Sequence, residues 1–136
     1  MNRKSDYGKG LKTRRKILGD EWVDRSIRNK TPFNEEFQEL ITRYAWNEIW
    51  NRKGLPHKVR RMLVITTMVA LGRWEEYSLH VRAALQSGDL TEADIKEVLL
   101  QAAVYCGIPA ANTAFKEAGA VMTDLAAGKT RKKPKR

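Results

Sequence analysis

Glu76 and His80 are the two side chains in this sequence whose types and spacing best suit chemistry. They stand four residues apart in a segment with helical periodicity, so a carboxylate and an imidazole share one helix face. His80 also falls within or at the edge of the apolar stripe of that helix, formed by Tyr77, Val81, Ala84 and Leu85. We therefore expect a half-buried histidine that donates a proton, with Glu76 fixing its tautomer and keeping its pKa near neutral. The alternative is a core histidine without a catalytic role.

An aromatic and cationic side characterises the helix expected over about residues 35–50. Arg43, Tyr44 and Trp46 lie on this side, and such a surface suits a pocket for an acidic ligand. Aromatic packing at a subunit contact is the alternative for Trp46 and Trp50. The sequence therefore offers Arg43 as a candidate to bind a carboxylate.

The next expected helix begins at Pro56 and is apolar over most of its circumference, which predicts a central core helix. Arg60 and Arg61 lie near its start and are placed to meet a carboxylate. A solvated arginine pair is the alternative for these two residues.

Helical periodicity extends over the rest of the chain, and no alternating run has the length of a strand. Gly88 suits a left-handed helix end, and Thr91 with Asp94 resembles a capping box. These signals predict an all-α protein with about six helices, expected near residues 7–18, 35–50, 56–70, 73–87, 92–104 and 110–126.

The net charge of +10 is concentrated at the two ends of the chain. Residues 1–30 and residues 129–136 each carry a net +6, whereas residues 31–128 carry −2. A specific DNA-binding protein carries its basic residues on a recognition helix, so this distribution argues against specific nucleic-acid binding. We expect a basic N-terminal arm (1–30) that packs on a neighbouring subunit, a helical domain (31–128) and a disordered basic tail (129–136).

Residue patterns that several other functions need are absent from the sequence. Cys106 is the single cysteine, which excludes an intrachain disulfide and a Cys-x-x-Cys pair. No metal-binding spacing of histidines and carboxylates and no glycine-rich phosphate loop is present, so we expect no metal. No apolar span or secretory signal is present either, and we expect a cytoplasmic protein without a membrane partner.

Three longer motifs occur in a fixed order, at residues 41–50 (ITRYAWNEIW), 75–84 (EEYSLHVRAA) and 97–112 (EVLLQAAVYCGIPAAN). With the shorter motifs RKILGD (15–20) and VDRS (23–26), the chain resembles the γ-carboxymuconolactone decarboxylase family over nearly all of its length except the basic tail. Several motifs in one order are more specific than any single motif. Asn47 and Lys53 stand where the family pattern has Gly and Pro, and neither position touches the expected chemistry.

This resemblance implies the alkylhydroperoxidase D-like helical fold and an obligate homo-oligomer, a homohexamer. Relatives with that fold carry Cys-x-x-Cys followed by a histidine four residues after the second cysteine. Counting back from His80 places Arg73 and Glu76 at the two thiol positions. Peroxide or disulfide chemistry by that route is therefore excluded here.

The reaction that the resemblance implies is the decarboxylation of γ-carboxymuconolactone to β-ketoadipate enol-lactone and CO2, a step of aromatic breakdown by the β-ketoadipate pathway. No cofactor is expected, because a C=C bond joins the carbon that loses CO2 to the lactone carbonyl and the substrate supplies its own electron sink. His80 is expected to protonate the ring carbon, with Glu76 orienting it.

Substrate-binding residues follow from the same resemblance, since the substrate is a small lactone dicarboxylate. An arginine is expected to anchor the acetate arm, with Arg43 and Arg73 ahead of Arg60 and Arg61. Aromatic residues are expected to give the departing carboxylate an apolar setting, namely Tyr44, Trp46 and Tyr105.

Three alternatives remain open from the sequence. The first alternative is a non-catalytic hexameric binding or assembly protein of the same fold. The second is a decarboxylase of a different small lactone or keto acid, and the third is a nucleic-acid binder with basic arms. The last alternative predicts binding that weakens steeply with salt.

Overall fold

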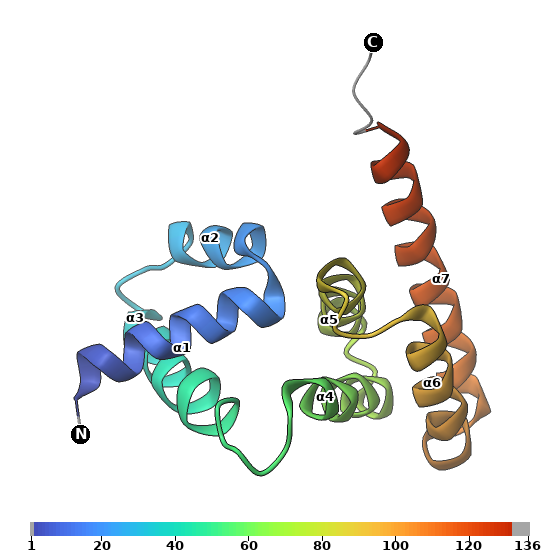
Figure 1. Cartoon of the computed structure of the whole chain (residues 1–136), viewed down its shortest axis with the longest axis horizontal. Helices are drawn as coiled ribbons and strands as arrows, with labels where there is room; N and C mark the ends of the chain where they lie inside the picture. The colour runs from blue at the N-terminus through green and yellow to red at the C-terminus, as the bar shows by residue number, and fades with distance from the viewer. Residues whose placement is uncertain (1, 132–136) are drawn as a thin grey trace. The chain divides into compact units, whose positions relative to one another are not determined.

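The computed structural model describes residues 2–131, with side chains placed as far as residue 128, and these residues form helices and no strand. This confirms the all-α prediction (Figure 1). The elements in chain order are α1 (Arg3–Leu18), α2 (Asp20–Arg28), α3 (Glu35–Ile41), the π-helix η1 (Thr42–Ile49), α4 (His57–Leu71), α5 (Trp74–Ser87), α6 (Glu92–Cys106) and α7 (Ile108–Arg131). The sequence did not predict α2 as a helix of its own or the π-helical form of η1.

The chain divides after Arg60 into two compact units, so the division falls inside α4. The sequence placed a boundary after residue 30, but α1 packs against η1 within the first unit. That residues 1–30 also contact a neighbouring subunit stays a prediction. The expected disordered tail begins inside α7, which continues past Gly128 to Arg131, and residues 132–136 lie outside the described part of the chain.

Gly10 lets α1 approach η1 closely in the first unit, where α1 lies across the α3–η1 segment (Figure 1). A Cβ atom at Gly10 would overlap the backbone carbonyl oxygen of Thr42. Thr42 is itself buried, and its hydroxyl donates to the carbonyl of Gln38 at 2.6 Å. Because a backbone atom cannot move aside as a side chain can, the close packing of the two helices requires glycine at this position.

Replacing Gly10 with alanine is expected to destabilise the protein by roughly 1 kcal/mol. The overlap with Thr42 costs about 1–3 kcal/mol, and the better helix propensity of alanine offsets up to about 1 kcal/mol of that cost. Gly8→Ala is the matched control, because Gly8 lies in the same helix and a Cβ atom added there would meet no atom within 4 Å. Chemical denaturation should show a lower free energy of unfolding for Gly10→Ala and a higher one for Gly8→Ala, each relative to the wild type. A stabilised Gly10→Ala variant would contradict the close approach of the two helices.

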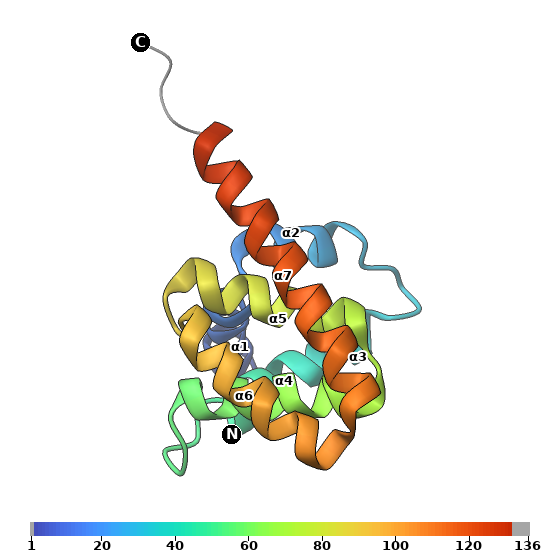
Figure 2. The same ribbon diagram turned by 90° about the vertical axis from the view of Figure 1, so that its right-hand side faces the viewer.

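The second unit is built around an apolar core shared by α4, α5, α6 and α7. In this unit α7 packs along both α5 and α6 (Figure 2). The Tyr77 hydroxyl donates to the carbonyl of Ala114 at 2.7 Å, which fixes α5 against α7. Alanines on the facing side of α7 allow this approach, as the sequence predicted. The core members come from all four helices and, for Leu90, from the α5–α6 turn: Ile65, Val69, Tyr77, Val81, Ala84, Leu90, Ile95, Leu99, Ala102, Ala114, Ala118 and Val121.

The turn between α5 and α6 has the caps that the sequence predicted. Gly88 ends α5 in the left-handed conformation, with φ 77°. Thr91 and Asp94 form a capping box, in which each side chain accepts from the other residue's backbone N–H. Both ends of this turn are therefore fixed, and Asp89 lies between them.

The helix α4 is buried on only one face, which differs from the expected central core helix. Ile65 and Val69 are buried, whereas Leu63 and Leu71 are more than half exposed. Among residues 2–131, the helices lack the combination of length and hydropathy that a membrane span requires.

Candidate active site

His80 is buried on α5, with 7% of its surface exposed, and its ring contacts an arginine of α4. The Nδ1 atom of His80 lies 3.2 Å from Nη1 of Arg61. A guanidinium has N–H donors and no acceptor, so Nδ1 must accept this hydrogen bond. The neutral ring therefore carries its proton on Nε2.

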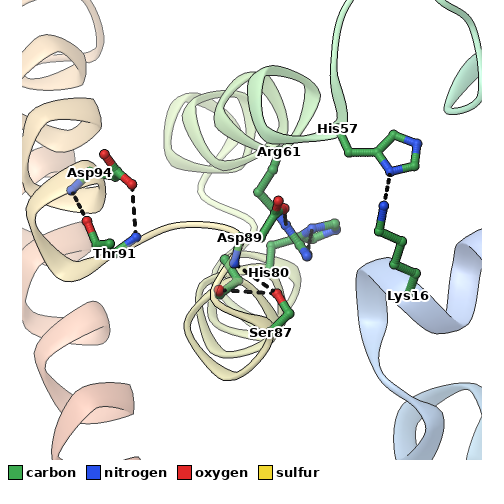
Figure 3. A network of polar contacts seen from close by, with 9 residues as sticks. Lys16, His57, Arg61, His80, Ser87, Asp89, Thr91 and Asp94 are labelled. Atoms are coloured by element: carbon green, nitrogen blue, oxygen red, sulfur yellow. Dashed lines mark hydrogen bonds and ion pairs between the residues drawn. The ribbon is translucent and has the colours of Figure 1, made fainter.

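Arg61 joins His80 to a carboxylate on the turn that follows α5. Its side chain is fully buried, and Nε lies 3.4 Å from Oδ2 of Asp89. Figure 3 shows these three side chains pointing toward one another from α4, α5 and the α5–α6 turn. Burial lowers the pKa of Arg61, and the Asp89 carboxylate opposes that shift. The sequence missed Asp89, for which the only signal was its place next to a capping glycine.

The pKa of His80 is lowered to about 4, mainly by burial and in addition by the positive charge of Arg61. The Glu76 carboxylate acts in the opposite direction but does not compensate. The expectation of a pKa near neutral is therefore wrong. At pH 7 the ring is uncharged, which suits a hydrogen-bond donor better than a proton donor.

Glu76 is held by Arg73 and not by His80 among the described residues. Nε and Nη2 of Arg73 donate to the two carboxylate oxygens of Glu76, both at 3.1 Å. This paired hydrogen bond lowers the pKa of Glu76. The expectation that Glu76 fixes the His80 tautomer is therefore wrong, because Arg73 lies three residues before Glu76 and reaches its carboxylate first.

The sequence pattern of the carboxymuconolactone decarboxylase family matches residues 35–120. The chain belongs to this family. It is 41% identical over 125 residues, 92% of each chain, to a 4-carboxymuconolactone decarboxylase of Acinetobacter baylyi. It is 44% identical over 103 residues to a nitrosuccinic acid decarboxylase of Metarhizium robertsii, covering 76% of this chain and 71% of the relative. A 4-carboxymuconolactone decarboxylase of Pseudomonas putida is 49% identical over 45 residues, which cover 33% of this chain and 94% of that sequence.

The carboxymuconolactone decarboxylase pattern covers both arginines near the start of α4, and the structure gives each a different place. Arg61 is fully buried. Arg60 donates to the carbonyls of Leu55 and Arg52, both at 3.2 Å. These hydrogen bonds join the start of α4 to the loop that precedes it. The burial of Arg61 contradicts the alternative of a solvated pair, and a contact of either arginine with substrate stays a prediction.

Arg43, Tyr44 and Trp46 all lie on η1, in the first unit. Such π-helical segments are frequent at functional sites. Arg43 lines a cavity of about 260 Å³ and, with Tyr44, a second of about 380 Å³. Trp46 stacks on Trp50 with ring centroids 5.5 Å apart, so these two residues pack against each other within one chain.

Tyr105 lies near the end of α6 and is 80% exposed. Its neighbours Val104 and Ile108 are also exposed, so it belongs to an apolar surface at the α6–α7 corner.

A cavity of about 280 Å³ between α6 and α7, which the sequence did not predict, is lined by apolar side chains with Lys96 and Glu92. Residues 2–131 hold no group of three or more histidine, cysteine or acidic side chains placed to bind a metal ion.

Proposed function

We propose that this protein catalyses the cofactor-independent decarboxylation of γ-carboxymuconolactone to β-ketoadipate enol-lactone and CO2. The observation that carries the proposal is the 41% identity to a 4-carboxymuconolactone decarboxylase over 92% of both chains. A match of this length spans α4, α5 and the turn that holds Asp89. The reaction belongs to the breakdown of aromatic compounds by the β-ketoadipate pathway.

The reaction can proceed without a cofactor, because the substrate itself accepts the electron pair that decarboxylation releases. The bond between the ring carbon and the departing carboxylate breaks, and its electron pair moves through the C=C bond onto the lactone carbonyl oxygen. One proton from solvent then adds to the ring carbon next to the carbonyl and completes the product. The protein therefore has to bind a dianion and stabilise the negative charge that develops on the carbonyl oxygen.

His80 is the group proposed to stabilise that oxygen. Its Nε2–H is the remaining N–H donor of a neutral ring whose Nδ1 accepts from Arg61. A neutral imidazole with a depressed pKa donates a hydrogen bond to a developing oxyanion without giving up its proton. This role replaces the proton transfer that the sequence suggested.

Arg73 is proposed to anchor the acetate arm of the substrate. Its guanidinium is largely exposed, and Glu76 holds it in a fixed orientation through two hydrogen bonds. An arginine oriented in this way has unused N–H donors for a second carboxylate. Glu76 is accordingly proposed to position Arg73 and not His80.

The remaining substrate contacts are proposed from the family resemblance alone. Arg43 is the alternative anchor for a carboxylate, and it lines cavities in the first unit. The setting proposed for the departing carboxylate is aromatic and comprises Tyr44, Trp46 and Tyr105.

A homohexamer is the proposed assembly, acting in the cytoplasm. The second unit alone leaves several large apolar side chains exposed, which are Leu63, Leu71, Leu100, Val104, Tyr105, Ile108 and Phe115. Apolar surface of this kind commonly marks a protein contact. Light scattering should give a mass six times the 15.6 kDa of the chain, and a monomeric mass would contradict the assembly.

Nitrosuccinic acid is the second candidate substrate, because the relative named for its decarboxylation is 44% identical to this chain over 103 residues. Both molecules carry one carboxylate on a carbon that is joined to an electron-accepting group, through the C=C bond in the lactone and directly in the nitro acid. Both also carry a second carboxylate for binding. In nitrosuccinic acid the nitro group takes the electron pair that the lactone carbonyl takes in the other substrate.

The test supplies purified protein, without added metal or cofactor, with each of the two substrates in turn and follows CO2 release. We expect turnover of γ-carboxymuconolactone with kcat/KM at least about 10-fold above that of nitrosuccinic acid, a difference of about 1.4 kcal/mol in transition-state binding. The reverse preference would transfer the proposal to the nitro acid. Turnover of neither would favour a non-catalytic binding protein of this family.

A further inference from the structure

We propose that Asp89 is a positioning residue for this decarboxylation: its carboxylate holds Arg61 so that Arg61 occupies Nδ1 of His80 and leaves the proton on Nε2. The inference rests on the proposed role of His80 as a hydrogen-bond donor. It adds a residue on the α5–α6 turn to a site otherwise built from α4 and α5.

The local backbone fixes where the Asp89 carboxylate lies. Gly88 turns the chain in the left-handed conformation, and the backbone N–H of Asp89 donates to Oγ of Ser87 at 3.2 Å. The N–H of Leu90 then returns to the carbonyl of Ala84 at 3.2 Å. Between these two bonds the Asp89 side chain reaches the buried Arg61, 3.4 Å from Nε, while 22% of its own surface stays exposed (Figure 3).

The electrostatic argument concerns the charge of Arg61. A buried guanidinium needs a nearby carboxylate, and removing that partner from a buried pair is strongly destabilising. Asp89 raises the pKa of Arg61 against the effect of burial. Glu76, whose carboxylate acts on His80, is engaged by Arg73 and does not take the place of Asp89.

The consequence for His80 is a change of tautomer. Without the Asp89 carboxylate, Arg61 is drawn toward water and its Nη1 leaves Nδ1 of His80. A free imidazole nitrogen can then carry the proton, and part of the population places it on Nδ1. In those molecules Nε2 is unprotonated, so the ring lacks the N–H donor that the oxyanion requires.

The experiment measures the tautomer and the rate separately in Asp89→Ala and Asp89→Asn. Nitrogen-15 NMR of histidine-labelled protein distinguishes protonated from bare ring nitrogens, and His57→Gln assigns the signals because the chain has two histidines. Asp124→Asn is the matched control, since it breaks an exposed aspartate–arginine pair, with Arg82, in the same unit.

We expect the wild type and Asp124→Asn to carry the proton on Nε2 alone. Asp89→Ala is expected to show a mixed tautomer and a kcat at least about 10-fold lower, with KM nearly unchanged. Asp89→Asn should lie between them, because an amide oxygen still accepts from Arg61. If Asp89→Ala fails to fold, the tautomer and kcat of Asp89→Asn are compared with those of the wild type instead.

An unchanged tautomer in both Asp89 variants would overturn the inference, as would a mixed tautomer with an unchanged kcat. The NMR measurement needs no substrate. If the wild type turns over neither substrate while the tautomer responds to Asp89, the proposed function fails and the structural coupling of Asp89 to His80 stands.

Discussion

Replacing His80 with alanine is expected to lower kcat by about 10²- to 10³-fold, the usual cost of removing one oxyanion donor. The loss arises in the transition state, because the negative charge on the lactone oxygen develops only there. KM is expected to change little, since the carboxylates of the substrate are held by other groups. Steady-state assays of CO2 release give both constants.

A second variant separates hydrogen-bond donation from proton transfer. Glutamine places an amide N–H near the position of Nε2 but cannot act as a general acid at neutral pH. His80→Gln is therefore expected to retain about 10-fold more activity than His80→Ala. Equal inactivity of the two variants would restore the proton-donor role for His80. Arg73→Lys serves as the contrast in the same assay, because losing the paired guanidinium contact should raise KM.

The stability of the folded protein is expected to fall by about 2 kcal/mol when the pH is lowered from 7 to 5, through His80. The folded pKa of His80 is about 4, below the ordinary value of 6.5 that applies to the unfolded chain. Between these values the unfolded state binds a proton that the folded state excludes. The contribution is therefore fully present above about pH 6.5 and is lost progressively as the pH falls toward 4.

Chemical denaturation at pH 7 and pH 5 tests this prediction against His80→Gln, which cannot titrate. The difference between the two proteins isolates His80 from every other group. The window ends at pH 5 because the pKa of Glu76 is also lowered, and its contribution is lost only at more acidic pH. A wild type and a His80→Gln variant with the same pH dependence would show that the ring is not kept neutral by burial.

The sequence alone determined the helical class, the caps of the α5–α6 turn and the buried face that carries His80. These features depend on residues within one or two helical turns of each other. Gly88 favours the left-handed conformation, and Thr91 with Asp94 satisfies the first N–H groups of α6, whatever lies around them. The family resemblance was confirmed for the same reason, since ordered motifs are a property of the chain and not of its packing.

Only the tertiary structure decided which residue contacts His80. The spacing of Glu76 and His80 puts them on one face, but spacing does not reveal that Arg73 binds that carboxylate. Arg61 is 19 residues away from His80 in sequence and lies on another helix. Asp89 is 28 residues from Arg61 and meets it only because α4 packs beside the α5–α6 turn. Periodicity tells which face of a helix is buried, whereas the partner on that face depends on how the helices pack. For His80 that partner adds its positive charge to the effect of burial, and both lower the pKa of the ring.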